Sequence, residues 1–197
     1  MKHPMQATAD NGRRFWIAWA MAFLGFPLGG TAAAVLVGAI TTPLTGALGG
    51  ALTGAVIGAA QWLVLRRRLP LTPAWIAATA LGMSVGLALS IALLGTDTAG
   101  SALPLRGLLT GAGIGAAQYL LLRGKISRAP VWALVVALSW AVGWLITRAA
   151  GVDLAQQWSV FGSSGALLFQ LLTGLTLAWL LQRGKGTADS QQVRLPA

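Results

Sequence analysis

The chain has 197 residues, of which 56% are hydrophobic and only 9% are charged, and its formal net charge is +10. Soluble globular proteins carry about 25% charged residues, so this composition excludes an ordinary soluble domain and indicates a membrane protein. The chain has no cysteine, which excludes disulfides and thiol chemistry, and its single histidine is His3. The basic residues lie between apolar runs, so we expect anionic lipid headgroups as their partner and no nucleic acid.

Six apolar stretches are long enough to cross about 30 Å of hydrocarbon. In chain order they cover residues 15–40, 44–65, 73–95, 104–122, 130–150 and 158–181. The first contains Gly25-Phe26-Pro27 near its middle, which predicts a kink or a strong tilt there. The fold class that we predict is therefore an all-α membrane protein with six transmembrane helices.

The first stretch has one alternative interpretation, as a cleaved signal. Asn11-Gly12-Arg13-Arg14-Phe15 has a faint similarity to a twin-arginine motif, and an apolar run follows it. That run continues to Ile40, however, and its glycines Gly25 and Gly29 fit an internal repeat. We therefore expect a retained helix.

The basic residues predict the orientation of the chain in the membrane. Twelve of the fourteen lie in the N-terminal tail, the second and fourth loops, and the C-terminal tail: Lys2, Arg13, Arg14, Arg66, Arg67, Arg68, Arg123, Lys125, Arg128, Arg183, Lys185 and Arg194. Only Arg106 and Arg148 lie on the other side. By the positive-inside rule, residues 1–14 and 184–197 are cytoplasmic tails on either side of a transmembrane domain, residues 15–183. We expect the protein to lie in the bacterial cytoplasmic (inner) membrane.

An internal repeat recurs at a spacing of 57 residues. Residues 52–66 and 109–123 are identical at twelve of fifteen positions, and a third, weaker copy ends at Arg183. Each unit contains two spans, so successive units enter the membrane the same way. The sequence predicts three tandem helical hairpins, at about 15–66, 73–123 and 130–183, arranged as a compact bundle with rough threefold pseudosymmetry.

Glycines recur every four residues in four of the predicted helices. They are Gly46, Gly50, Gly54 and Gly58, then Gly82 and Gly86, then Gly107, Gly111 and Gly115, and the pair Gly25 and Gly29 of the first helix has the same spacing. Small residues four apart form a groove in which a neighbouring backbone can approach closely, so we predict helix packing through these faces. A groove for a ligand or pigment is the alternative.

Three glutamines are the candidate polar site. Gln61 and Gln118 each precede an arginine by five residues, which places them about 7–8 Å inside the cytoplasmic end of a helix. They either pair across helices or face the axis and bind an ion or headgroup. Gln170 lies deeper in the last span and has no counterpart in the repeat.

Aromatic and basic residues mark the predicted cytoplasmic boundary. Tyr119 and six tryptophans lie there and are interpreted as an interfacial belt: Trp16, Trp19, Trp62, Trp75, Trp132 and Trp179. Trp140 lies deeper in its span and is expected in the core. The basic clusters are interpreted as topology anchors and lipid-headgroup contacts: Arg66, Arg67, Arg68, Arg123, Lys125, Arg128 and Arg183.

Acid–base and metal chemistry lack residues inside the membrane. The middle of every predicted span is free of Asp, Glu, His, Lys and Arg. Proton relays, intramembrane proteolysis and metal or haem ligation need such residues. We therefore expect no enzyme, no metal site and no cofactor.

The repeated pattern resembles a group of small, uncharacterised bacterial polytopic membrane proteins whose even helices end in GxxxGxxQWLxLR. Here the pattern is carried by residues 54–66 and 111–123, and the third copy departs from it at Ala178. The resemblance implies no known activity.

Our leading hypothesis is a non-enzymatic accessory, assembly or scaffolding component that packs against itself or another membrane protein. A small transporter or channel with a pseudo-threefold polar site, and a binder of lipid, quinone or pigment, are the alternatives.

Overall fold

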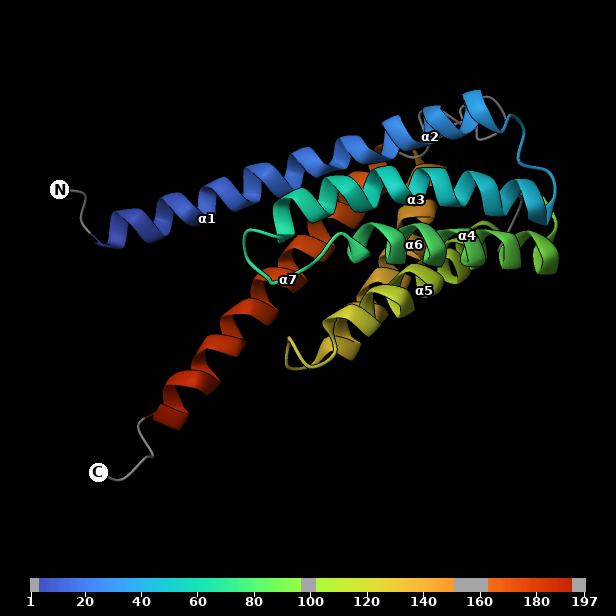
Figure 1. The fold of residues 1–197 in the computed structure, drawn as a ribbon. Coiled ribbons are helices and arrows are strands. Elements are labelled where there is room, and N and C mark those ends of the chain that lie inside the picture. Colours follow the sequence, from blue (N-terminus) through green and yellow to red (C-terminus); the bar gives the residue numbers. More distant parts are fainter. Residues whose placement is uncertain (1–3, 97–101, 151–162, 193–197) are drawn as a thin grey trace.

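The structure is a computed structural model, which describes residues 4–96, 102–150 and 163–192, with side chains for 12–96, 102–150 and 164–181. Every regular element in this part of the chain is a helix (Figure 1). The elements are α1 (Pro4–Met21), the 3-10 helix η1 (Ala22–Leu24), α2 (Gly25–Leu36), α3 (Pro43–Leu65), α4 (Ala74–Leu94), α5 (Ala102–Leu122), α6 (Ala129–Ala149) and α7 (Ser163–Gln192).

The first span is interrupted where the sequence predicts. Pro27 has no N–H to donate to the carbonyl of Phe23, and its ring crowds that carbonyl, so a regular α-helix cannot pass through this point. The chain forms the 3-10 turn η1 instead, and the N–H of Gly25 donates to the carbonyls of Ala22 and Phe23. Helices α1, η1 and α2 still follow one another as a single long rod (Figure 1).

Local sequence signals set the ends of the other helices. Thr42 and Thr45 form a reciprocal capping box at the start of α3, and Pro43 occupies its first turn, where a missing N–H has no cost. Gly95 ends α4 with a φ of 65°, a backbone conformation that glycine adopts more easily than other residues.

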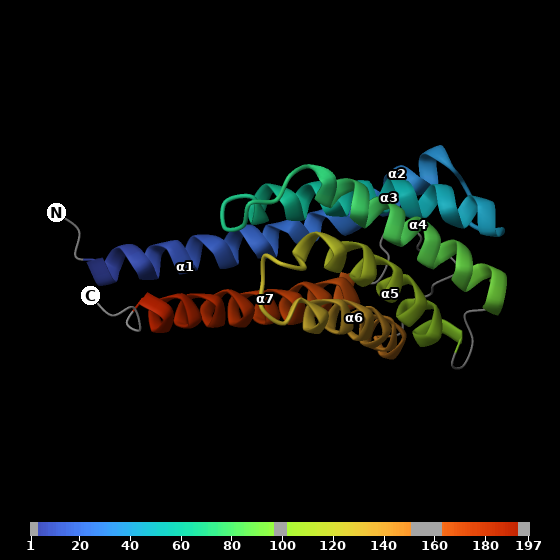
Figure 2. The same cartoon turned by 60° about the horizontal axis from the view of Figure 1, so that its bottom comes forward.

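The helices pack in chain order, and α7 closes the bundle by packing against α1. The start of α1 and the end of α7 lie at one end of the bundle, together with the α3–α4 and α5–α6 connections (Figures 1 and 2). The α2–α3 connection and the end of α4 lie at the opposite end (Figures 1 and 2).

The outside of the bundle is apolar and the polar side chains point inward. In the described part of the chain, five helical segments are long and apolar enough to cross a membrane: 12–36, 43–65, 74–94, 129–149 and 164–181. Leucines such as Leu63, Leu81 and Leu138 are exposed, whereas Gln61 and Gln118 are buried. This is the reverse of a soluble protein, and the fold is that of a multi-pass integral membrane protein.

The six predicted spans agree with the structure in part. Five are confirmed as helices of sufficient length and apolarity. The remaining one, predicted at 104–122, is the 21-residue helix α5, which is long enough but contains the polar residues Arg106 and Gln118. The predicted start of the last span, 158–162, lies outside the described residues.

Aromatic rings fill the core between α2, α6 and α7. Phe26, Trp140 and Phe169 form a triangle with ring centroids 5.5–5.9 Å apart. The expectation that Trp140 packs in the core is confirmed. A cavity of about 10 Å³ beside this triangle is large enough for about one water molecule.

Candidate functional site

The two repeat-related glutamines meet inside the bundle, although they lie on different helices. Gln61 on α3 and Gln118 on α5 are each 1% exposed. Nε2 of Gln118 lies 3.4 Å from Oε1 of Gln61 and donates to Thr79 Oγ1 on α4 at 2.9 Å. Its Oε1 accepts from the indole N–H of Trp132 on α6 at 2.9 Å. The amide of Gln118 therefore links α3, α4 and α6 to α5.

Gln61 has a matching but looser environment. Its Oε1 accepts from the indole N–H of Trp75 at 3.4 Å, and the hydroxyl of Thr79 donates to the carbonyl of Trp75 at 2.8 Å. The rings of Trp75 and Trp132 are tilted by 54° with centroids 6.2 Å apart. We call Gln61, Trp75, Thr79, Gln118 and Trp132 the buried amide network. None of its side chains titrates near neutral pH, so it can exchange hydrogen bonds but cannot act as a general acid or base.

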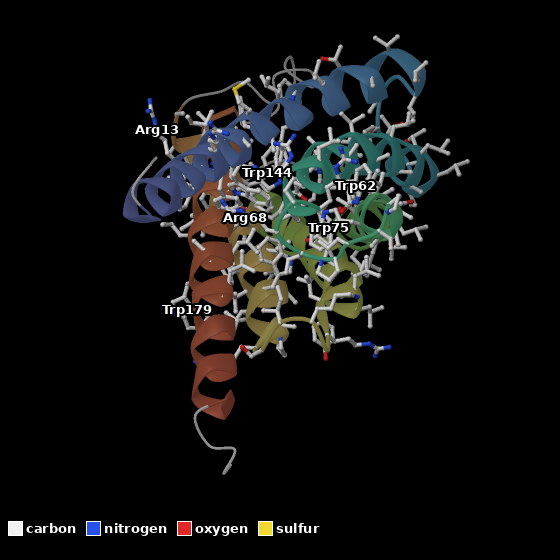
Figure 3. All side chains as sticks on the ribbon, turned by 60° about the vertical axis from the view of Figure 1, so that its left-hand side comes forward. Arg13, Trp62, Arg68, Trp75, Trp144 and Trp179 are labelled. Carbon is white, nitrogen blue, oxygen red and sulfur yellow. The ribbon has the colours of Figure 1, made fainter. Side chains whose placement is uncertain are left out.

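The interpretation of all boundary tryptophans as an interfacial belt is wrong for three of them. Trp75 and Trp132 are 0% exposed, Trp19 is 1% exposed, and each donates its indole N–H inside the protein. Figure 3 shows Trp75 among the helices. An indole near a buried amide gains a strong acceptor that lipid tails cannot offer. One sequence signal points to this pairing: each of Trp75 and Trp132 follows its glutamine by 14 residues.

Gln170 does not join the buried amide network. It pairs with Trp19 on α1: its Nε2 donates to the Trp19 carbonyl at 2.6 Å, and the Trp19 indole N–H donates to the Gln170 carbonyl at 2.8 Å. Gln170 is 3% exposed, and its Oε1 has no hydrogen-bond partner among the described residues. This reciprocal pair joins the last helix to the first.

Most of the predicted packing glycines contact the helix that follows in the chain. A Cβ atom placed on Gly54 of α3 would lie 2.7 Å from the Thr79 carbonyl oxygen of α4, and one on Gly82 would lie 2.5 Å from the Gly113 carbonyl oxygen of α5. Gly111 of α5 approaches Ala137 of α6 in the same way. The remaining predicted glycines meet the next helix too: Gly50, Gly58, Gly86, Gly107 and Gly115. Gly46 is looser, because its close neighbour is the flexible end of the Ile91 side chain.

The glycine pair of the first span and three further glycines extend this pattern around the bundle. Gly25 and Gly29 of α2 meet α3, Gly143 of α6 meets Gly165 of α7, and Gly174 of α7 meets Trp19 of α1. Each helix from α2 to α6 therefore presents at least one glycine to the next helix, and α7 presents one to α1. Backbones this close gain dispersion contacts that a larger side chain would prevent.

The basic residues of the predicted anchors lie on the surface. The guanidinium of Arg66 lies 4.6 Å from the ring centre of Trp62, that of Arg68 lies 5.3 Å from Phe15, and that of Arg128 lies 5.7 Å from Trp179. Arg67, Arg123 and Lys125 are also exposed, and the side chain of Arg183 lies outside the described residues.

Sequence reasoning missed the role of Arg106. It is 7% exposed, and its Nη2 donates to the carbonyl oxygen of Gly95 at 2.7 Å. A cation is favourable at the carboxyl end of α4, where helix carbonyls carry partial negative charge. Its position eleven residues after a helix-ending glycine is the signal that the sequence contains.

No protein-family model, curated protein or solved structure matches the chain. The resemblance to small bacterial membrane proteins therefore stays a prediction based on the repeated motif.

Proposed function

We propose that the chain is a six-span protein of the bacterial cytoplasmic membrane with both termini in the cytoplasm. The placement of the described ends of α1 and α7 at one end of the bundle supports an even number of spans (Figure 2). The α3–α4 and α5–α6 connections at that end carry six basic residues, and the positive-inside rule makes this end cytoplasmic.

The polar residues of α5 are compatible with its being the sixth span. Arg106 is bonded to Gly95 near one end of the helix, and Gln118 is bonded within the buried amide network near the other. Both side chains are buried, so neither is presented to lipid. A helix that hides its polar groups inside a bundle can cross a membrane at a lower overall apolarity.

Three tandem hairpins are supported by contacts that recur at the repeat spacing. Gly25 meets Ile57, and 57 residues later Gly82 meets Ile114. Gly54 meets Ala80, and Gly111 meets Ala137 at the same spacing. The third unit differs, because Gln170 pairs with Trp19 rather than with the two other glutamines.

We propose a non-enzymatic accessory, assembly or scaffolding role, carried by the observation that both amide groups of the network are directed at protein partners. The polar atoms that could bind a solute instead hold helices together. The surface left for a partner is apolar, and the outward face of α5 carries the exposed small residues Ala112 and Ala116 four positions apart. Such a face accepts a helix of a second copy or of another membrane protein.

Purification of the full chain in mild detergent tests this role. We expect a defined oligomer or a stoichiometric membrane partner by native mass spectrometry, and the double substitution Ala112→Leu with Ala116→Leu should dissociate it. The matched control is Ala77→Leu with Ala92→Leu on the exposed face of α4. A strict monomer without a partner would contradict the proposal.

The alternatives lose the residues on which they depended. Transport through a pseudo-threefold polar site needs accessible glutamines, but Gln61 and Gln118 bond each other and their neighbours. Binding of lipid, quinone or pigment in the glycine grooves needs open grooves, but the next helix fills them. A flux assay in proteoliposomes checks the first: a flux that Gln61→Leu with Gln118→Leu abolishes would favour transport.

A further inference from the structure

A basic hollow opens between α1 and the end of α3. Its volume is about 430 Å³, within the range of about 300–1,000 Å³ typical of small-molecule pockets. Six residues line it: Arg14, Phe15, Ala18, Val64, Arg67 and Arg68. We call this set the α1–α3 hollow.

The α1–α3 hollow combines cationic walls with an apolar floor. Arg14 comes from α1, whereas Arg67 and Arg68 follow the last residue of α3, so two separate segments contribute three arginines to the lining. The floor is formed by Phe15, Ala18 and Val64. Planar guanidinium groups bind phosphate oxygens through paired hydrogen bonds, and an apolar floor suits the glycerol and upper acyl carbons of a lipid.

The aromatic floor also holds one of the cations in place. The Arg68 guanidinium lies 5.3 Å from the ring centre of Phe15. In Figure 3, Arg68 lies beside α1, whereas Arg13 points away from the bundle. A guanidinium held in this way loses less side-chain entropy when it binds an anion.

The level of the α1–α3 hollow matches the membrane surface. The first apolar stretch of the sequence begins at residue 15, and helix α3 ends at Leu65. All three arginines therefore lie within three residues of a span end, where lipid phosphates are found. Asp10 is the only acid in the N-terminal tail, and the connection 66–73 has none, so the arginines outnumber nearby acids in the sequence.

We propose that the α1–α3 hollow is a specific site for the phosphate headgroup of one anionic membrane phospholipid, which bridges α1 and the end of α3. The site is distinct from the general attraction of cytoplasmic arginines to anionic lipid, because Arg66, the neighbour of Arg67, stacks on Trp62 and does not line it. It is also independent of any partner on the face of α5.

Native mass spectrometry of the full chain in detergent, titrated with phosphatidylglycerol or phosphatidylcholine, tests the site. We expect one phosphatidylglycerol per chain and no comparable binding of phosphatidylcholine. Arg67→Gln with Arg68→Gln should weaken phosphatidylglycerol binding by about tenfold or more, since charged hydrogen bonds contribute strongly to phosphate binding. Arg14→Gln, on the α1 side of the hollow, should also weaken phosphatidylglycerol binding.

The matched control is Arg66→Gln with Arg123→Gln, which removes the same charge from the same end of the bundle and should keep the affinity within about twofold of that of the parent chain. All variants should elute and melt like the parent, since each substituted side chain is exposed. Equal loss in the control, or equal binding of phosphatidylcholine, would overturn a specific site. Displacement of the lipid by inorganic phosphate would assign the hollow to a soluble phosphate instead.

Discussion

Gln118 is the residue at which the buried amide network converges. Its amide contacts an indole N–H, a hydroxyl and a second amide on three other helices. Gln61 has two longer contacts of 3.4 Å. Because buried polar groups cost free energy when they lose a partner, the two repeat-related positions should differ in their contribution to stability.

We expect Gln118→Leu to lower the free energy of unfolding by about 1–2 kcal/mol and Gln61→Leu by less than about 1 kcal/mol. Gln118→Leu leaves the Trp132 indole N–H without its acceptor and the Thr79 hydroxyl oxygen without its donor. Gln61→Leu removes only the two longer contacts. Thermal unfolding of the detergent-solubilised variants measures this difference. If Gln61→Leu destabilised the protein as much as Gln118→Leu or more, the network would not be centred on Gln118.

The sequence identified these glutamines but not their tryptophan partners. Gln61 and Gln118 stand out because few polar residues occur in the spans and because they recur at the 57-residue spacing. Trp75 and Trp132 recur too, but their depth near the membrane boundary is also that of ordinary belt residues. Sequence position gives the depth of a side chain and not the rotation of its helix, and the rotation decides whether an indole meets lipid or an amide.

At the scale of the helices, glycine sets how closely neighbours approach. The Gly82 site gives a strict test, because its neighbours in α5 are the backbone atoms of Gly113 and Ile114 rather than movable side chains. A methyl group there can be accommodated only if the backbone of one of the two helices shifts.

We therefore expect Gly82→Ala to destabilise the protein by about 1–3 kcal/mol, the usual cost of overpacking. Gly12→Ala is the control: it also lies in a helix, but a Cβ atom there meets nothing within 4 Å, and alanine is the better helix former. Thermal stability and detergent resistance of both variants provide the measurement. Tolerance of alanine at Gly82 would mean that α4 and α5 are not in backbone contact.

The helices themselves were predictable, and their partners were not. Length, apolarity and the break at Pro27 follow from the sequence because each is a local property. A glycine every four residues shows that a groove exists, but the pattern is silent on which helix fills it. The bundle fills almost every groove with the next helix in the chain, a choice that depends on the short connections between spans.

At the scale of the whole molecule, the pairing of Gln170 with Trp19 and the contact of Gly174 with Trp19 close the bundle. The repeat alone would place a glutamine at Ala178, near the cytoplasmic boundary, so the sequence does not predict this closure. The third unit is instead joined to the first helix by a reciprocal side-chain-to-backbone pair at a different depth.

The number of spans depends on α5 and can be measured with one cysteine on each side of it. The chain has no cysteine, so Thr96→Cys, just after α4, and Ser127→Cys, between α5 and α6, each give a single reactive thiol at an exposed position. If α5 crosses the membrane with the predicted orientation, a membrane-impermeant maleimide applied to intact cells should label position 96 but not position 127. Permeabilised cells should label both, which controls for reactivity. Only α5 separates the two positions. Labelling of both or of neither in intact cells would therefore mean that α5 does not cross the membrane. Labelling of position 127 alone would reverse the orientation derived from the twelve cytoplasmic charges.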